Sequence, residues 1–213
     1  MKLYTYFRSS AAFRVRIALN LKGLAYEPVF VHLAKGEHRK PEYAAKYPQG
    51  LLPTLVTDGL ELSQSLAIIE YLDETHPEPA LLPRDAPGRA RVRSLSLLVA
   101  CEIHPLNNLR TLQYLKRQLG QSEEQVNTWY RHWIADGLAK LEADLLRGRK
   151  GKFCHGDTPT MADCCLVPQI FNAKRYNCDL SPYPATLRVF DECMKLDAFD
   201  RAQPAKQPDA ITP

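Results

Sequence analysis

The chain has 213 residues, enough for one large domain or two small ones. Its composition, 45% hydrophobic and 24% charged, is ordinary for a soluble globular protein. The net charge of +4 is small and lacks the clustered basic stripe of a nucleic-acid binder, so we expect no nucleic-acid partner. No run of about 18 apolar residues occurs, and we therefore expect no membrane-spanning helix.

The cysteines favour a reducing compartment. The opening residues Met-Lys-Leu-Tyr-Thr-Tyr-Phe-Arg lack the apolar stretch of a secretory signal, and no cysteine or histidine spacing fits a zinc site. We therefore expect a cytoplasmic protein with reduced, mostly buried thiols and no metal. Residues 1–100 contain no cysteine, and the six that follow are Cys101, Cys154, Cys164, Cys165, Cys178 and Cys193.

The first eighty residues predict a small α+β domain. Residues 2–6 and 27–32 have the composition of strands, and between them a helix runs from a cap at Ser9 or Ser10 to Gly23. A strand, a helix and a strand in succession favour a parallel pair with a right-handed crossover.

The rest of this domain begins with an irregular polar stretch. Residues 35–50 suit a short helix and loops. Two strands, 54–57 and 60–62, follow, and Asp58-Gly59 between them favours a type I′ hairpin. A helix capped by Ser65 completes the order βαβαββα.

Four prolines within eleven residues, Pro77, Pro79, Pro83 and Pro87, indicate a stiff linker. Beyond the linker no convincing strand appears. We predict two domains, 1–82 and 88–213, the second all-α, with a loose tail from Gln203. The predicted helices of the second domain are residues 89–119, 122–146, 160–176 and 183–196.

This architecture resembles that of cytosolic glutathione transferases, with a thioredoxin-like N-terminal domain and an all-α C-terminal domain. Tyr-Phe-Arg-Ser-Ser-Ala-Ala-Phe-Arg-Val-Arg-Ile-Ala-Leu (residues 6–19) is similar to the active-site segment of the zeta class. Residues 51–55, 64–72 and 160–169 resemble its cis-proline loop, its γ-glutamyl-binding segment and its internal helix cap. The resemblance covers nearly the whole chain and implies glutathione-dependent isomerisation of maleylacetoacetate or maleylpyruvate.

One departure concerns the thiol of the zeta class. Its cysteine and the following serine are Ala11 and Ala12 here, so side reactions that depend on that thiol are in doubt. The hydroxyls of Ser9 and Ser10 remain as catalytic candidates. One hydroxyl hydrogen bond to a charged acceptor contributes about 1.5–3 kcal/mol, enough to favour the thiolate of a bound glutathione. The alternative is that both serines only cap the helix.

The resemblance implies glutathione as the cofactor and a set of residues that bind it. Gln64 and Ser65 would hold the γ-glutamyl group at a helix N-terminus, unless they too are a simple cap. His38 would bind the glycyl end or lie idle in solvent. The full set is Ser9, Ser10, Ala11, His38, Gln49, Leu52, Pro53 (after a cis bond), Gln64, Ser65, His104 and Asn108.

Three arginines are the candidates for substrate binding, since arginine recognises carboxylates bidentately and a maleyl substrate carries two. They are Arg8, Arg110 and Arg175. His104 and Asn108, at i and i+4, would share a helix face near Arg110, or form a network around a kink at Pro105. All four surplus positive charges fall after residue 88, in the domain expected to bind the acid.

The hypothesis is that the glutathione thiolate, held by Ser9, adds to the cis double bond. The resulting single bond then rotates, and the thiolate leaves. The arginines would bind carboxylates and stabilise the enolate. One alternative is a transferase that consumes glutathione on α-haloacids or other electrophiles, and another is a non-catalytic glutathione-binding module. A homodimer is expected from the resemblance alone, and the choice between maleylpyruvate and maleylacetoacetate stays open.

Overall fold

The computed structural model describes residues 1–148 and 151–210. The chain forms two compact units, one of Met1–Leu81 with Met194–Pro213 and the other of Leu82–Cys193. The predicted linker lies at the join between them, but residues 194–210 differ from expectation because they pack with the first unit. Among the described residues, no helix is long and apolar enough to cross a membrane.

The first unit is built on a four-stranded mixed sheet in the order β2-β1-β3-β4. Its strands are β1 (Lys2–Thr5), β2 (Glu27–Phe30), β3 (Thr54–Thr57) and β4 (Leu60–Ser63). The predicted parallel pair is confirmed, since β1 runs parallel to β2, while β1 with β3 and β3 with β4 are antiparallel. Leu3 of β1 is paired with Leu55 of β3, and both are fully buried.

Turn chemistry fixes the ends of these elements. Asp58 and Gly59 both have positive φ, 49° and 77°, as the predicted type I′ turn requires. The helix α3 (Ser65–Thr75) starts one residue earlier than predicted, because its N-cap is Gln64 (φ 68°) and not Ser65. Ser65 is instead the first helical residue.

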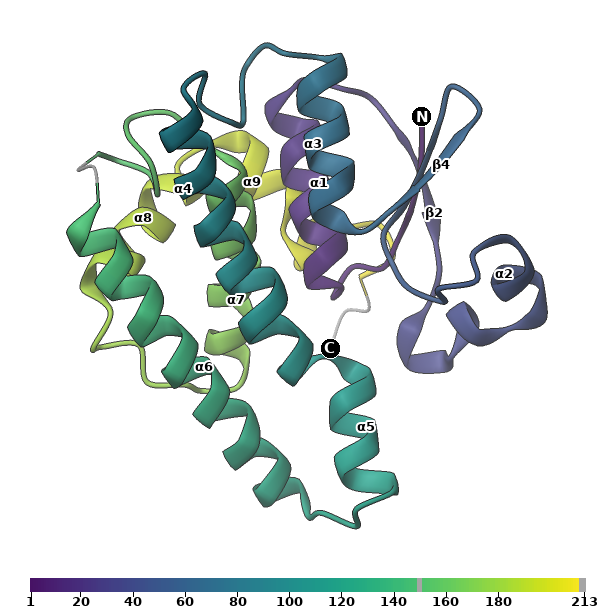
Figure 1. The fold of residues 1–213 in the computed structure, drawn as a ribbon. Helices are drawn as coiled ribbons and strands as arrows, with labels where there is room; N and C mark the ends of the chain where they lie inside the picture. The colour runs from purple at the N-terminus through teal and green to yellow at the C-terminus, as the bar shows by residue number, and fades with distance from the viewer. Residues whose placement is uncertain (149–150, 211–213) are drawn as a thin grey trace. The chain divides into compact units, whose positions relative to one another are not determined.

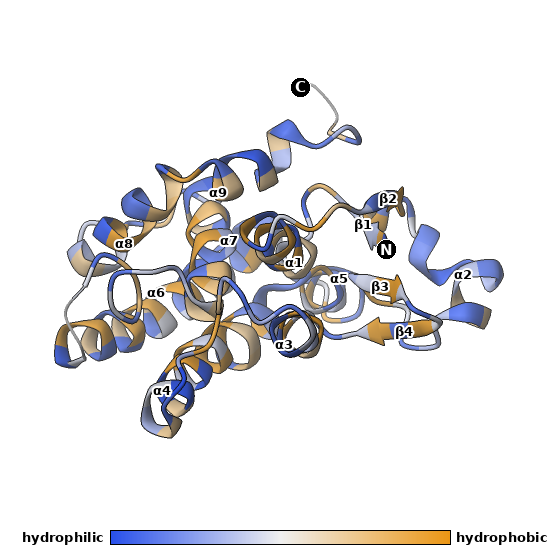
Figure 2. Ribbon diagram, turned by 90° about the horizontal axis from the view of Figure 1, so that it is seen from above, coloured by the Kyte–Doolittle hydropathy of each residue, from blue (hydrophilic) through white to orange (hydrophobic). Residues whose placement is uncertain are grey.

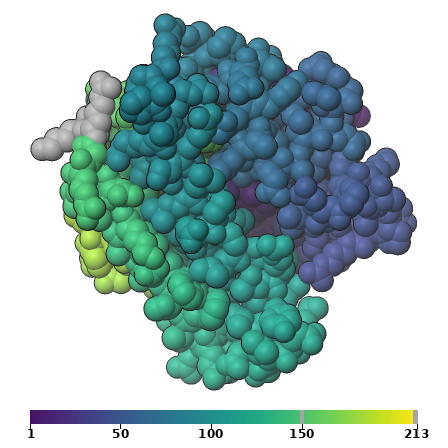
Figure 3. Space-filling model, viewed as in Figure 1, coloured from purple at the N-terminus to yellow at the C-terminus, as the bar shows by residue number. Residues whose placement is uncertain are grey.

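Three more α-helices belong to the first unit: α1 (Ser10–Leu21), α2 (Pro41–Lys46) and α9 (Asp197–Ala202). Helix α1 packs against both α3 and α9 (Figure 1). Strands β3 and β4 are coloured mostly apolar, whereas α2 is polar, in keeping with the irregular segment predicted over residues 35–50 (Figure 2). The segment that contains α2 protrudes at the edge of this unit (Figure 3).

The second unit is helical, as predicted. Apart from an isolated bridge between Phe153 and Gly156, its described residues contain no strand pairing. Helix α7 is its centre, because residues 161–170 are all buried. The helices are α4 (Ala86–Leu97), α5 (Leu109–Arg117), α6 (Glu123–Arg147), α7 (Met161–Arg175) and α8 (Pro184–Met194).

The single helix predicted over residues 89–119 is wrong. Helix α4 passes into a π-helical turn, Leu98–Ile103, and then a 3-10 turn, His104–Asn107, before α5 begins. Pro105 has no backbone N–H to continue an α-helix, and its ring clashes with the preceding turn. The chain therefore restarts at Asn108, whose side chain accepts a hydrogen bond from the Thr111 N–H at 3.2 Å.

Candidate functional site

Ser9 is the N-cap of α1. Its Oγ accepts a hydrogen bond from the Ala12 N–H at 3.2 Å, and its own N–H donates to the Tyr6 carbonyl at 2.9 Å. The capping role is thus present, and it uses Ser9 Oγ only as an acceptor. The hydroxyl proton can still be donated to an anion at the positive end of the helix. Ser9 is half-buried, whereas Ser10 is buried with 7% of its surface exposed, so the geometry favours Ser9 as the donor.

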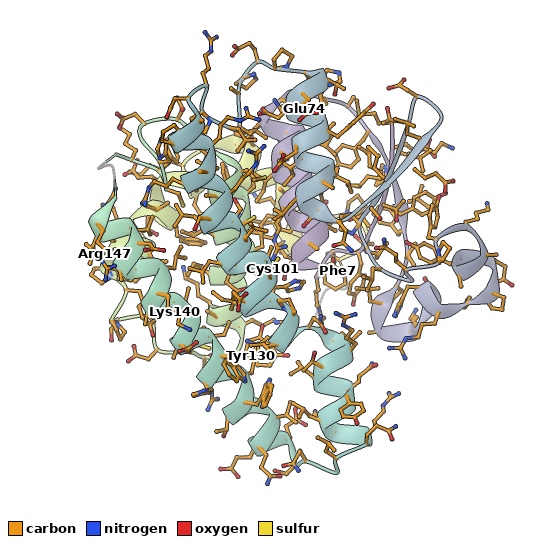
Figure 4. The ribbon with its side chains drawn as sticks, in the orientation of Figure 1. Phe7, Glu74, Cys101, Tyr130, Lys140 and Arg147 are labelled. Carbon is orange, nitrogen blue, oxygen red and sulfur yellow. The ribbon has the colours of Figure 1, made fainter. Side chains whose placement is uncertain are left out.

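The loop before β3 approaches the serine loop through apolar packing. The Leu52–Pro53 peptide bond is cis, as predicted, and both residues are buried. Leu52 shares a hydrophobic cluster with Tyr6 and Phe7, which immediately precede Arg8 and Ser9. Figure 4 labels Phe7 beside the first turn of α1. The loop that precedes Ser9 and the loop that contains Pro53 therefore share one hydrophobic cluster in the first unit.

The N-terminus of α3 is suited to a carboxylate. Gln64, its N-cap, makes no side-chain cap hydrogen bond, and its Nε2 donates instead to Gln49 Oε1 at 2.9 Å. Ser65 Oγ accepts from the Arg14 Nη1 of α1 at 3.2 Å, with both residues buried. Gln64 is thus the N-cap by position but makes no side-chain cap hydrogen bond, and the first N–H groups of α3 remain available to an anionic group.

His38 is buried, with 7% of its surface exposed, so the alternative of an idle histidine in solvent is wrong. Its Nδ1 is buried without a hydrogen-bond partner within the described part of the chain. Burial, and secondly the charge of Arg39, lowers the pKa of His38 below its usual value, so the ring is neutral at neutral pH. A neutral ring with an unsatisfied nitrogen is suited to a polar ligand atom.

The first unit thus contains an unpartnered buried nitrogen, on His38, and a helix start without a side-chain cap, at α3, while the glutathione-binding role of these residues stays a prediction. The hydrogen bond from Arg14, in the second turn of α1, to Ser65, the first residue of α3, connects the two helices. The orphaned nitrogen of His38 and the uncapped start of α3 both fit an extended ligand with charged and polar ends. Ala11, half-buried in the first turn of α1, presents only a methyl group there.

In the second unit, His104 and Asn108 do not share a helix face, and that prediction is wrong. His104 begins the 3-10 turn and Asn108 is the N-cap of α5. Asn108 does take part in a network around Pro105, because Thr111 Oγ1 donates to the Pro105 carbonyl at 2.8 Å and to Asn108 Oδ1 at 3.3 Å. The glutathione-binding role given to these two residues stays a prediction.

The three arginines are all exposed. Arg8 lies over the ring of Phe7 at 4.8 Å in the first unit, and Arg110 lies in the first turn of α5. Arg175 is the last residue of α7, with its guanidinium 4.9 Å from the ring centre of Tyr176. Their accessibility is compatible with the predicted carboxylate binding.

Arg175 is held by aromatic residues that the sequence analysis did not single out. Tyr130 of α6, labelled in Figure 4, stacks on Tyr176 with ring centres 3.6 Å apart. Burial raises the pKa of Tyr130, and a hydrogen bond with Arg175 opposes that rise. The position of Arg175 thus depends on residues about forty-five positions apart, which no local pattern could indicate.

Two family models match the chain. The glutathione S-transferase N-terminal domain matches residues 3–80, and the C-terminal domain of the same family matches residues 123–192. A relative from Ralstonia sp., a maleylpyruvate isomerase, is 51% identical over 99% of this chain and 100% of its own. The chain belongs to the glutathione S-transferase family.

Solved structures similar to this chain belong to the same family. The holo structure of a bacterial maleyl pyruvate isomerase, described as a zeta-class glutathione S-transferase, is 51% identical with a TM-score of 0.97, covering 99% of this chain and 100% of the other. A maleylacetoacetate isomerase from Methylobacterium extorquens AM1, with malonate and glutathione bound, is 43% identical with a TM-score of 0.96 and full coverage of both chains. The resemblance to the zeta class and the glutathione transferase fold are thereby confirmed.

Proposed function

We propose that this protein is a glutathione-dependent isomerase that converts maleyl dicarboxylates, maleylpyruvate or maleylacetoacetate, into their trans isomers. The observation that carries the proposal is the hydrogen bonding of Ser9 and its position at a helix start. Its oxygen is engaged by the Ala12 N–H, its proton is free to be donated, and it stands at the N-terminus of a buried helix. Relatives of about 50% identity over their full length that bear these enzyme names support the substrate class.

Bound glutathione supplies a thiol whose reversible addition turns the cis double bond of the substrate into a rotatable single bond. Ser9 would donate its hydroxyl proton in a hydrogen bond to the sulfur, which favours the thiolate. The α3 N-terminus, with Gln64 and Ser65, would hold the γ-glutamyl carboxylate, and the Leu52–Pro53 backbone would orient the cysteinyl part.

The substrate's own charges would be met by arginine. Arg8, Arg110 and Arg175 would bind its carboxylates and stabilise negative charge that develops on the conjugated oxygen. Arg175 is pre-positioned for this, because its side chain makes a hydrogen bond with Tyr130 and its guanidinium lies 4.9 Å from the ring centre of Tyr176. Pre-positioning reduces the entropy lost when a carboxylate is captured.

The direct test follows cis–trans conversion with and without glutathione. We expect conversion of maleylpyruvate or maleylacetoacetate to require glutathione, and the concentration of free glutathione to be unchanged after many turnovers. A transferase acting on α-haloacids would deplete glutathione in proportion to product, and a non-catalytic module would bind it without turnover. Conversion that ignores glutathione would refute the proposal. The ratio of kcat/KM for the two substrates identifies the physiological one.

A second prediction concerns Arg175. We expect Arg175→Ala to raise the KM for the maleyl substrate about tenfold, because a charge-assisted hydrogen bond contributes about 1.5–3 kcal/mol, while the KM for glutathione stays within about twofold. Lys174→Ala is the matched control, since Lys174 is the adjacent exposed cation and lies over the ring of Phe190. Equal effects of the two substitutions on the substrate KM would show that only general positive charge matters.

We further propose a cytoplasmic homodimer that acts in aromatic catabolism. Four of the six free cysteines are buried, as suits a reducing compartment, and burial raises the pKa of the Cys154 thiol well above its usual value. Large apolar side chains such as Leu60 and Leu97, each 46% exposed, could be covered by a second subunit. Light scattering of the purified protein measures the oligomeric state.

A further inference from the structure

The C-terminal segment is attached to the first unit at several points. Asn20 Nδ2 of α1 donates to the Ala198 carbonyl at 2.9 Å, and Phe199 and Ala202 of α9 are buried. Helix α9 lies beside α1 in Figure 1. The tail predicted to be loose from Gln203 is therefore ordered over its described part, with a 3-10 turn at Pro204–Lys206. Ala210 packs against the cluster that contains Tyr6 and Phe7.

Arg16 links this segment to the loop that leads to Ser9. It is fully buried, and its guanidinium donates to the carbonyls of Ala202 (3.1 and 3.2 Å), Phe7 (3.1 Å) and Tyr6 (3.4 Å). The Tyr6 carbonyl also accepts from the N–H of Ser9. The Tyr6 carbonyl thus accepts hydrogen bonds from both the Ser9 backbone and the Arg16 side chain.

Asp209 makes the second attachment. Its Oδ2 accepts a hydrogen bond from the Phe7 N–H at 2.9 Å, across 202 residues of sequence. Burial lowers the pKa of Arg16 to about 10, and the charges of Tyr26 and Asp209 oppose this drop, so Arg16 remains a cation at neutral pH. The loop at residues 6–9 is therefore held from both sides, by Arg16 through its carbonyls and by Asp209 through an N–H.

We propose that Asp209 is a positioning residue for Ser9: by accepting from the Phe7 N–H, the C-terminal segment fixes the direction in which the Ser9 hydroxyl donates to the glutathione sulfur. The inference rests on the proposed function of Ser9 and extends it to a residue at the other end of the chain. Misplacement of a reacting group by about 1 Å can cost roughly a hundredfold in rate, so a contact two residues from Ser9 can matter.

The test compares Asp209→Ala with Asp209→Asn, whose side-chain carbonyl can still accept from Phe7. For Asp209→Ala we expect the pKa of the bound glutathione thiol, followed by thiolate ultraviolet absorbance, to rise and kcat to fall about tenfold, with the KM for glutathione within about twofold. Asp209→Asn should restore most of both losses. Asp197→Ala is the control, since Asp197 belongs to the same segment and pairs at the surface with Arg201.

The inference is overturned if Asp209→Ala lowers only the melting temperature, leaving the thiol pKa and kcat at wild-type values, or if Asp209→Asn is as impaired as Asp209→Ala. Should Asp209→Ala fail to fold, the thiol pKa and kcat are measured for Asp209→Glu, in which the carboxylate is displaced by one methylene. The same criteria then apply. A wild-type protein that binds glutathione without lowering its thiol pKa refutes the role of Ser9 itself. Normal wild-type behaviour with an unaffected Asp209→Ala refutes only the inference.

Discussion

Ser9→Ala is expected to lower kcat/KM for maleyl isomerisation about a hundredfold. Loss of one hydroxyl hydrogen bond to a charged sulfur removes about 1.5–3 kcal/mol, and each 1.36 kcal/mol is a factor of ten. The pKa of the bound glutathione thiol should rise correspondingly, and the two quantities are measured by steady-state kinetics and by thiolate absorbance against pH. The helix also loses its cap, which should lower the free energy of unfolding by about 1 kcal/mol.

Ser122→Ala separates these two effects. Ser122 caps α6 as Ser9 caps α1, with the same 3.2 Å between its Oγ and the N–H three residues on. We expect it to lower stability by a similar amount while leaving turnover intact. Ser10→Ala should cost less activity than Ser9→Ala, because Ser10 is the more buried of the two. A Ser9→Ala variant with wild-type kcat/KM would contradict the role of Ser9 as the hydrogen-bond donor to the thiolate.

The sequence predicts those parts of the fold that local chemistry decides. The positive φ angles of Asp58 and Gly59 follow from a turn type that favours such residues, and the hairpin is where the pattern places it. Gly23, just beyond α1, likewise has a positive φ of 65°. The strand–helix–strand order was sufficient to predict the parallel pair β1–β2, because handedness leaves few topologies.

The errors arise where tertiary contacts override local preference. Residues 89–119 have helical composition throughout, and only Pro105 signalled the break that the structure contains. The tail from Gln203 is rich in proline, which favours a loose segment, yet its Asp209 accepts a hydrogen bond from Phe7, and Ala202 just before it accepts one from Arg16. Hydrogen bonds across about 200 residues leave no periodicity in the sequence.

The candidate site shows the same division. Ser9 could be predicted as a helix cap from local sequence, whereas Gln64 and the cis bond before Pro53 followed from the resemblance to the zeta class, and the predicted cap at Ser65 was one residue late. The supporting groups could not be predicted. Arg14 in a helix of apolar residues resembles any amphipathic position, and only its hydrogen bond to Ser65 shows that it connects α1 to the N-terminus of α3.

Asp163→Ala is expected to lower the free energy of unfolding by about 3 kcal/mol or more, a larger loss than that expected for Ser9→Ala. Asp163 is fully buried in the first turn of α7, where its carboxylate accepts from the N–H groups of Cys154 (2.8 Å) and Thr160 (2.7 Å) and from Thr160 Oγ1 (2.8 Å). Burial raises the pKa of this carboxyl, and these hydrogen bonds oppose the rise. Alanine would leave two backbone donors unsatisfied, each costing about 1–3 kcal/mol.

Thermal unfolding measures this loss, and a chain of this size should show a fall in Tm of about 6–12 °C for 3 kcal/mol. Asp191→Ala is the matched control, because Asp191 is exposed on α8 of the same unit and should change stability by less than about 0.5 kcal/mol. Equal melting temperatures for the two variants would contradict the assignment. Kinetics at a temperature where Asp163→Ala remains folded should give a wild-type pKa for the bound thiol, since Asp163 stabilises the helical unit and Ser9 belongs to the other.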